Sequence, residues 1–282
     1  MAKRKGDNNN MGSNKKSKKL SGANVEPGWS GIYVTCVRGK EAACKNEIVR
    51  IFDDYAHEFY GPELQRYLED LKAEEENAPA AEEKQVFIED LVAQEIAELK
   101  DANQAYKTRE EKKKEFFSGY EIGCECVIFI RTRKPIDPVD LVLRICRDTQ
   151  KTGTKRSRYA QRLTPVSLTG VATAEGFRKL AETVLNPIFH SGSPDQPAYK
   201  FAIRPTLRNH SILGRDEIIK TLAEIVCRSD GHSVDLKQYD KMIIVECYKS
   251  SIGMSVVDEF DSLERLNIQQ IFEKAQNYGD DK

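Results

Sequence analysis

Tyr199-Lys-Phe-Ala-Ile-Arg-Pro-Thr-Leu-Arg-Asn-His210 joins a short apolar segment to a run of hydrogen-bond donors. The segment 201–203 predicts a strand that ends at Arg204-Pro205, because proline has no N–H to give to a sheet and restrains the residue before it. The loop expected after this strand carries donors and no carboxylate. That composition suits phosphate oxygens and base edges, which accept hydrogen bonds.

The residues that follow predict one helix and two strands. Asp216 and Glu217 open the helix, where carboxylates suit the positive N-terminal end, and apolar residues then recur on one helical face. Residues 242–245 form a continuous apolar run, which is typical of a strand buried on both faces, and residues 252–256 alternate like its neighbour. The local order is therefore strand, basic loop, helix and two strands.

Four short segments carry a resemblance to a known family: Phe201 to His210, Val234-Asp-Leu236, Ile243-Ile-Val-Glu246 and Gly253-Met-Ser-Val256. Taken together they resemble a THUMP domain, and the upstream residues 162–166 fit the same family's approach to this domain. The whole stretch from about residue 28 to residue 260 resembles the eukaryotic, fungal-type THUMP proteins that assist tRNA cytidine acetylation.

The resemblance implies tRNA as the ligand, with its acceptor end near the THUMP domain, and a separate RNA acetyltransferase as the protein partner. It further implies N4-acetylcytidine formation in serine and leucine tRNAs. After Val257 only residues 261–275 are left to form a helix, far fewer than the roughly 100 residues of an ordinary domain. We therefore expect a non-catalytic adaptor with no catalytic residue, cofactor or metal of its own.

Charge is strongly segregated along the 282 residues, although the net charge is only −1. Residues 131–162 carry ten lysines and arginines against three aspartates, whereas residues 61–116 carry nine against sixteen acidic residues. The basic stretch is a candidate phosphate-binding surface, and its alternative is a solvated face without a partner. The acidity of the second stretch argues against contact between that segment and RNA.

The predicted fold class is α+β. A basic tail at residues 1–27, expected to be disordered, precedes a ferredoxin-like domain at 28–166, a THUMP domain of the α/β type at 167–260 and a C-terminal helix and tail at 261–282. Within the first domain, strand-like and helical patterns alternate through residues 31–55 and 124–166. A helix capped by Asp137 and Pro138 belongs to this series.

An acidic helical insertion is expected at residues 61–116, where Gly61-Pro62 should end the preceding helix. Two helices should follow, and the second has an apolar stripe that either docks on its own domain or offers a face to a partner. The stripe consists of Ile88, Val92, Ile96 and Leu99.

The tail contains the basic clusters Lys3-Arg-Lys5 and Lys15-Lys-Ser-Lys-Lys19, which match nuclear import signals or an unstructured RNA-binding arm. We expect a nuclear, and specifically nucleolar, location. The start of the chain lacks the apolar core of a secretory signal, and no apolar run approaches the roughly 20 residues that span a bilayer. Seven cysteines without framework spacing fit a reducing compartment, and Cys124-x-Cys126 lacks the second ligand pair of a closed zinc site.

The predicted RNA-binding residues lie in two basic segments. The loop at 151–159 concentrates cations beside Tyr159, which could stack on an unpaired base, and the second segment is the donor run at 204–210. The candidates are Lys155, Arg156, Arg158, Arg162, Arg204, Arg208, Asn209 and His210.

Two other functions remain open. In the first, the chain is itself an acetyltransferase, with residues 150–155 as a partial match to the loop that holds the CoA pyrophosphate before a helix. This match fails at Lys155, where a bulky side chain replaces the small residue that close backbone approach requires. In the second, the chain is a protein-interaction scaffold that acts through the acidic segment. Nucleotide-binding glycine motifs are absent from the sequence.

Overall fold

The structure is a computed structural model that describes residues 25–77, 115–193, 195–228 and 231–280. Its N-terminal part is a four-stranded antiparallel sheet in the order β2-β3-β1-β4, with two helices on one face. The elements in chain order are β1 (Ser30–Cys36), α1 (Glu41–Asn77), β2 (Phe117–Cys124), β3 (Val127–Thr132), α4 (Pro138–Thr152) and β4 (Ala160–Val166). This strand order is the predicted ferredoxin-like arrangement.

Local sequence signals account for α4. The Asp137 carboxylate accepts a hydrogen bond from the backbone N–H of Val139 at 2.8 Å, and Pro138 occupies the first helical turn, as predicted. Gly153 ends the helix in the left-handed conformation, with its N–H donating to the carbonyl of Thr149.

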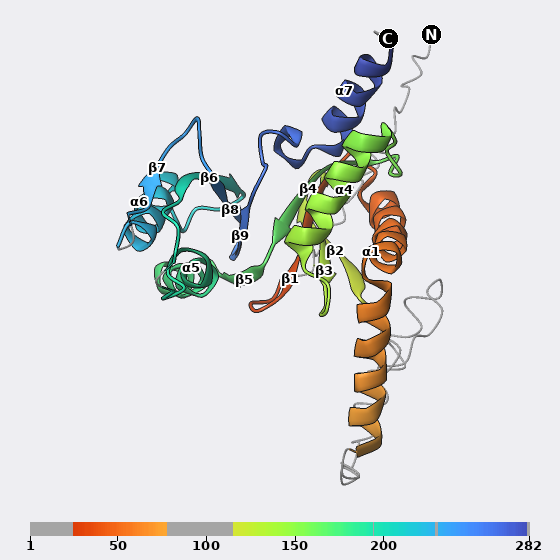
Figure 1. Cartoon of the computed structure of the whole chain (residues 1–282), viewed down its shortest axis with the longest axis horizontal. Helices are drawn as coiled ribbons and strands as arrows, with labels where there is room; N and C mark the ends of the chain where they lie inside the picture. Colours follow the sequence, from red (N-terminus) through yellow and green to blue (C-terminus); the bar gives the residue numbers. More distant parts are fainter. Residues whose placement is uncertain (1–24, 78–114, 194, 229–230, 281–282) are drawn as a thin grey trace, which may run out of the picture.

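The prediction that Gly61-Pro62 ends the first helix is wrong. Helix α1 continues through both residues to Asn77, and Figure 1 shows its orange C-terminal half extending beyond the sheet. Tyr60 and Leu64 are buried on either side of the proline, so packing on both sides offsets the hydrogen bond that the proline removes. The expected second helix of the insertion, with Ile88 to Leu99, lies outside the described residues.

Strand β2 is absent from the sequence prediction. That prediction places the acidic insertion up to residue 116 and strand character only from Cys124 onward, so it leaves residues 117–123 without an element. Cys124 ends β2, whereas Cys126 lies in the turn before β3 with a φ of 61°. The two thiols therefore do not lie on one strand.

The C-terminal part is a five-stranded sheet in the order β5-β9-β8-β6-β7. Its elements are β5 (Leu168–Val171), α5 (Ala174–Phe189), β6 (Lys200–Arg208), α6 (Arg215–Val226), β7 (Ser233–Val234), β8 (Lys241–Tyr248) and β9 (Ser251–Val257). Helices α5 and α6 cover one face through a shared apolar core. The predicted apolar face of α6, with Ile218, Leu222 and Ile225, is buried there.

Strand β6 does not end at Arg204-Pro205, which corrects the prediction of a loop from that point. It pairs in parallel with β8 from Phe201 to Arg208, whereas β7 pairs with it only at Lys200 and Phe201. The Pro205 carbonyl accepts from the Arg215 guanidinium at 2.8 Å. In a parallel strand the N–H and C=O of one residue point the same way, so the missing N–H of Pro205 falls on the unpaired edge and removes no ladder bond.

The two sheets meet through β4, β5 and β9. The backbone N–H of Ser167 donates to the carbonyl of Met254 at 2.9 Å, and the Ser255 hydroxyl donates to the carbonyl of Pro165 at 2.7 Å. Beyond β9, a 3-10 turn, η1 (Glu264–Leu266), leads to α7 (Ile268–Asp280), which returns to pack on α4 and β4. Figure 1 shows the dark blue α7 beside the end of α4. The core of the first sheet thus includes residues from both halves of the chain.

Candidate nucleic-acid interface

Three arginines from two strands share the region where the sheets meet. Side chains alternate along a strand, so Arg204 and Arg208 project from the side of β6 opposite to Ile203 and Leu207, which pack against the core under α5 and α6. Arg162 of β4 lies within electrostatic reach of both. We call Arg162, Arg204 and Arg208 the arginine face.

Arg162 is held firmly at this face. Its backbone N–H donates to the Thr35 hydroxyl at 3.1 Å, and its Nε is buried without a hydrogen-bond partner. Burial lowers the pKa of the Arg162 guanidinium, and the neighbouring charge of Arg204 lowers it further. Positive charges gathered in this way favour an anion as their partner.

The other two arginines differ in exposure. The Arg204 guanidinium lies 5.5 Å from the centre of the Phe260 ring and is half-buried, whereas Arg208 is exposed at the end of β6. Asn209 follows with a φ of 50°, and its side-chain amide donates to the Cys124 sulfur at 3.6 Å. Asn209 thus lies beside β2 of the first sheet, with Arg208 before it at the end of β6, whereas Arg204 lies in the middle of β6.

His210 has an internal role for both of its ring nitrogens. Nε2 accepts from the backbone N–H of Leu213 at 2.9 Å, so Nδ1 carries the proton and donates to the carbonyl of Lys249 at 2.6 Å. The ring thereby links the loop after β6 to the turn between β8 and β9. Both ring nitrogens are therefore already hydrogen-bonded within the protein.

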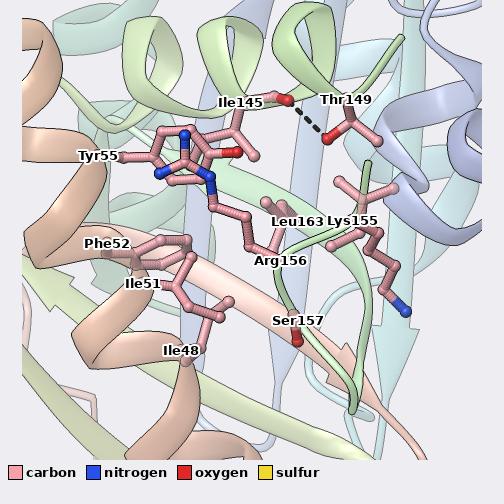
Figure 2. Close-up of a pocket in the computed structure, with 11 residues that line it drawn as sticks. Ile48, Ile51, Phe52, Tyr55, Ile145, Thr149, Lys155, Arg156, Ser157 and Leu163 are labelled. Atoms are coloured by element: carbon pink, nitrogen blue, oxygen red, sulfur yellow. Dashed lines mark hydrogen bonds between the residues drawn. The ribbon is translucent and has the colours of Figure 1, made fainter. Parts of the chain in front are cut away.

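The predicted basic loop at 151–159 makes internal contacts with the rest of the protein. The Arg156 guanidinium lies 4.0 Å from the centre of the Tyr55 ring and forms an ion pair with Glu58 at 2.9 Å. Figure 2 shows Arg156 over this ring and Lys155 pointing away from it. Lys155 donates to the side chain of Gln269 on α7, and burial lowers the pKa of its ammonium group.

Glu47 of α1 shapes the rest of this loop. Its carboxylate accepts from the Ser157 hydroxyl and from the backbone N–H of Arg158, each at 2.9 Å, and from the N–H of Tyr159 at 3.2 Å. The Arg158 side chain is exposed, and within the described part of the chain it has no ion pair. Of the three predicted loop cations, Arg158 is therefore the most available to an external phosphate.

The pocket beneath this loop is small and mainly apolar. It has room for about one water molecule and lies between α1, α4 and the 155–157 segment, with the Tyr55 ring and Arg156 at its rim. The lining residues are Ile48, Ile51, Phe52, Tyr55, Ile145, Thr149, Lys155, Arg156, Ser157, Leu163 and Ile268. A space of this size is a packing gap between helices, too small for a nucleotide or a CoA group.

Residues 150–155 also lack the geometry of a pyrophosphate loop. Residues 150–152 are the C-terminal end of α4, where the helix dipole is negative, and residues 153–155 begin the loop that leads to the strand β4. The Gly153 N–H is already used to cap this helix. A pyrophosphate cradle instead requires free N–H groups at the N-terminus of a helix.

Among the described residues, no group of three histidine, cysteine, aspartate or glutamate side chains could hold a metal ion. The helices in the described ranges are also too short or too polar to cross a bilayer.

Glu246, the acidic residue at the arginine face, is not among the predicted site residues. It lies on β8 opposite Thr206 and is only 6% exposed, with Oε2 lacking any hydrogen-bond partner. Burial raises the pKa of this carboxyl group to about 7, against the lowering effect of Arg208 and Arg162. The signal was present in the sequence, because Glu246 is the one charged residue in the apolar segment 242–248.

Comparisons with known proteins agree with this architecture. The family model "THUMP domain" matches residues 171–257. The chain is 38% identical to "tRNA acetyltransferase TAN1" of Saccharomyces cerevisiae over 95% of its own length and 93% of that protein. It is 30% identical to human "THUMP domain-containing protein 1", covering 88% of this chain and 65% of that protein. A Drosophila melanogaster homolog of the same name is 28% identical, covering 92% and 80%. The chain therefore belongs to the family of THUMP-domain proteins that includes the yeast protein.

Proposed function

We propose that this chain is a tRNA-binding adaptor that presents tRNA to a separate acetyltransferase. The observation that carries RNA binding is the arginine face, where Arg204 and Arg208 of β6 lie within electrostatic reach of Arg162 of β4. The name of the yeast relative, "tRNA acetyltransferase", supports tRNA as the RNA and acetyl transfer as the reaction. The proposal extends, from the family resemblance, to N4-acetylcytidine in serine and leucine tRNAs.

In this proposal the arginines act mainly on the RNA backbone. Guanidinium groups bind phosphates through paired N–H donors and release counterions, which gives affinity without demanding a particular base sequence. Arg208 and Arg158 are exposed enough to meet phosphates directly. Arg162 and Arg204 are half-buried and contribute positive potential from the floor of the same region.

The adaptor is favoured over an enzyme by the segment 150–155, which ends a helix and uses its glycine N–H internally. An acetyl-CoA site at this position would lack its anion-binding N–H groups. The name of the yeast relative favours the enzyme alternative. Purified full-length chain incubated with acetyl-CoA and unmodified tRNA separates the two, since turnover without a partner would refute the adaptor.

The RNA-binding residues can be tested by replacing two arginines together. We expect Arg204→Gln with Arg208→Gln to weaken tRNA binding about tenfold and to lower the salt slope of affinity by about 1, because Arg208 is the one of the two that meets a phosphate directly and each lost phosphate contact removes about 1 from that slope. Binding is measured by fluorescence anisotropy across a range of salt concentrations.

A matched control replaces Arg178 and Lys179 with glutamine. Both are exposed on α5, which covers the opposite face of the same sheet, so this variant loses equal charge away from the arginine face. Unchanged affinity in the first variant, or equal losses in both, would remove these arginines from the site. Thermal unfolding verifies that both variants are folded, since Arg204 also contacts Phe260.

The pathway is tested in cells that lack this chain. We expect N4-acetylcytidine to disappear from their tRNA and to return when the intact gene is restored. A nucleoside profile that does not change would contradict the acetylation role and leave only the proposal of RNA binding.

The location we propose is the nucleus, and within it the nucleolus. The basic clusters Lys3-Arg-Lys5 and Lys15-Lys-Ser-Lys-Lys19 support import. Replacing their lysines and arginines with alanine should leave a fluorescent fusion in the cytoplasm, and retained nuclear signal would contradict the assignment.

A further inference from the structure

Glu246 places a buried carboxyl group beside the arginines that we assign to RNA. Its Oε2 has no hydrogen-bond partner, and the Nε of Arg162 and the hydroxyl of Tyr33 are also buried and unpartnered. Among the described residues these are the three buried side-chain atoms in this condition. All three belong to the place where the two sheets meet, because Tyr33 and Arg162 each interact electrostatically with Glu246.

The groups that face Glu246 come from each strand packed around it. Gly253, its partner on β9, adds no side chain. The titratable, charged or hydroxyl groups that face it are Tyr33 of β1, Arg162 of β4, Thr206 and Arg208 of β6, and Tyr248 of β8. The neighbouring Cys247 points to the opposite face of the sheet, into the core under α5 and α6. Within the described residues no arginine nitrogen comes within ion-pair distance of the carboxylate, so its charge is compensated only at longer range.

Two opposing effects therefore set the charge of Glu246. Burial favours the neutral acid, and the nearby hydroxyls of Tyr248 and Thr206 together with the field of Arg208 and Arg162 favour the carboxylate. The balance brings the pKa to about 7, where both forms are populated at neutral pH. A change in the local field then shifts the population of protonated Glu246.

RNA would make such a change. Phosphates bound to the arginine face bring negative charge toward the carboxylate and neutralise the field that stabilises it. The neutral acid is favoured in the complex, and the proton comes from solvent.

We infer that Glu246 takes up a proton when the arginine face binds RNA phosphates, so that the RNA affinity of this chain falls as the pH rises. This inference rests on the RNA-binding function proposed above. Glu246 would not touch the RNA in this inference. Its protonation would change the net charge around the arginines that bind the phosphates.

The test measures binding of an unmodified tRNA transcript to the full chain at constant ionic strength. If bound RNA raises the pKa of Glu246 by about one unit, linkage predicts about fivefold weaker binding at about pH 8 than at about pH 6. Glu246→Gln should abolish this dependence and bind at both pH values about as tightly as the natural chain at the lower one. Glu224→Gln, an exposed residue of α6, is the matched control and should keep the natural dependence.

Isothermal titration calorimetry in two buffers of different ionisation enthalpy counts the protons directly. We expect an uptake of about half a proton per binding event near pH 7.5 in the natural chain, and none that is attributable to this site in Glu246→Gln. A purely structural role of Glu246 would leave the proton count unchanged.

The outcomes separate the inference from the function on which it rests. Absence of tRNA binding at every pH would refute RNA binding itself. Binding with equal pH dependence in the natural chain and in Glu246→Gln, or with no dependence, would overturn the inference alone. If Glu246→Gln does not fold, carbon-13 NMR titration of the glutamate carboxyls of the natural chain decides. A glutamate carboxyl group that titrates near neutral pH, with a pKa that rises when tRNA is added, supports the inference. The absence of such a carboxyl group overturns it.

Discussion

The carboxyl group of Glu246 is buried in a strand whose other members are apolar, and this burial links its protonation to the stability of the fold. Its pKa rises from an ordinary value of 4.5 to about 7. The folded state therefore binds the proton more tightly than the unfolded state does. The contribution to stability is fully present below about pH 4.5 and is lost as the pH rises through about 7.

We expect Glu246→Gln to raise the free energy of unfolding at about pH 8 by up to about 3 kcal/mol, because glutamine stays neutral where the natural carboxylate is charged and buried. At about pH 5 the two proteins should differ little. Urea unfolding at both pH values measures the difference. A gain that is as large at the lower pH as at the higher would contradict an ionisation effect.

The candidate site shows how far residue type alone can be interpreted. The clustering of cations at 151–162 and 204–210 is visible in the sequence, and the arginine face does form from both segments. The internal partners of Arg156 and His210 are not visible, because Tyr55 lies 101 positions away from the first and Lys249 lies 39 positions away from the second. Such distant contacts depend on how the strands and helices pack.

At the scale of single elements, α1 is the case where a local rule is overridden. Pro62 is exposed within a continuous 37-residue helix, where it removes one intrahelical donor and crowds the preceding turn. The buried residues Tyr60 and Leu64 stabilise the helix on both sides of it. Gly61-Pro62 therefore does not end the helix, because tertiary packing stabilises the helix by more than the proline destabilises it.

We expect Pro62→Ala to raise the free energy of unfolding by about 1 kcal/mol or more, because alanine restores the missing hydrogen bond and favours the helix. Glu63→Ala, the next exposed position, is the control and should change stability little. Both are measured by urea unfolding. Loss of stability in Pro62→Ala would indicate that the proline is needed for the geometry of this helix.

At the scale of the whole molecule, the junction between the two sheets positions Arg162 of the first sheet against Arg204 and Arg208 of the second. Gly253 of β9 permits this approach. A Cβ atom at this position would lie 2.8 Å from Val166 Cγ1 and 3.4 Å from the Tyr33 ring. The arginine face therefore depends on a close contact between β9 and the first sheet.

We expect Gly253→Ala to destabilise the protein by about 1–3 kcal/mol, because the added methyl group forces Val166 and Tyr33 aside. Gly170→Ala is a matched control in the neighbouring strand β5, since its Cβ would meet Leu180 at an ordinary 3.5 Å. Thermal and urea unfolding compare the two variants. Equal effects would show that strand glycines are interchangeable here and that the junction is not especially tight.

The sequence by itself determined which segments become strands and helices over most of the chain, and it indicated the THUMP family through four short segments. These features are encoded locally, in the period of apolar residues and in caps such as Asp137. Only the tertiary structure decided that β6 continues through Pro205, that α1 continues through Pro62 and that Glu246 is buried within the electrostatic field of Arg162 and Arg208. The physical reason is that an unpaired edge, a stabilising contact or a shifted pKa depends on neighbours brought from distant parts of the chain.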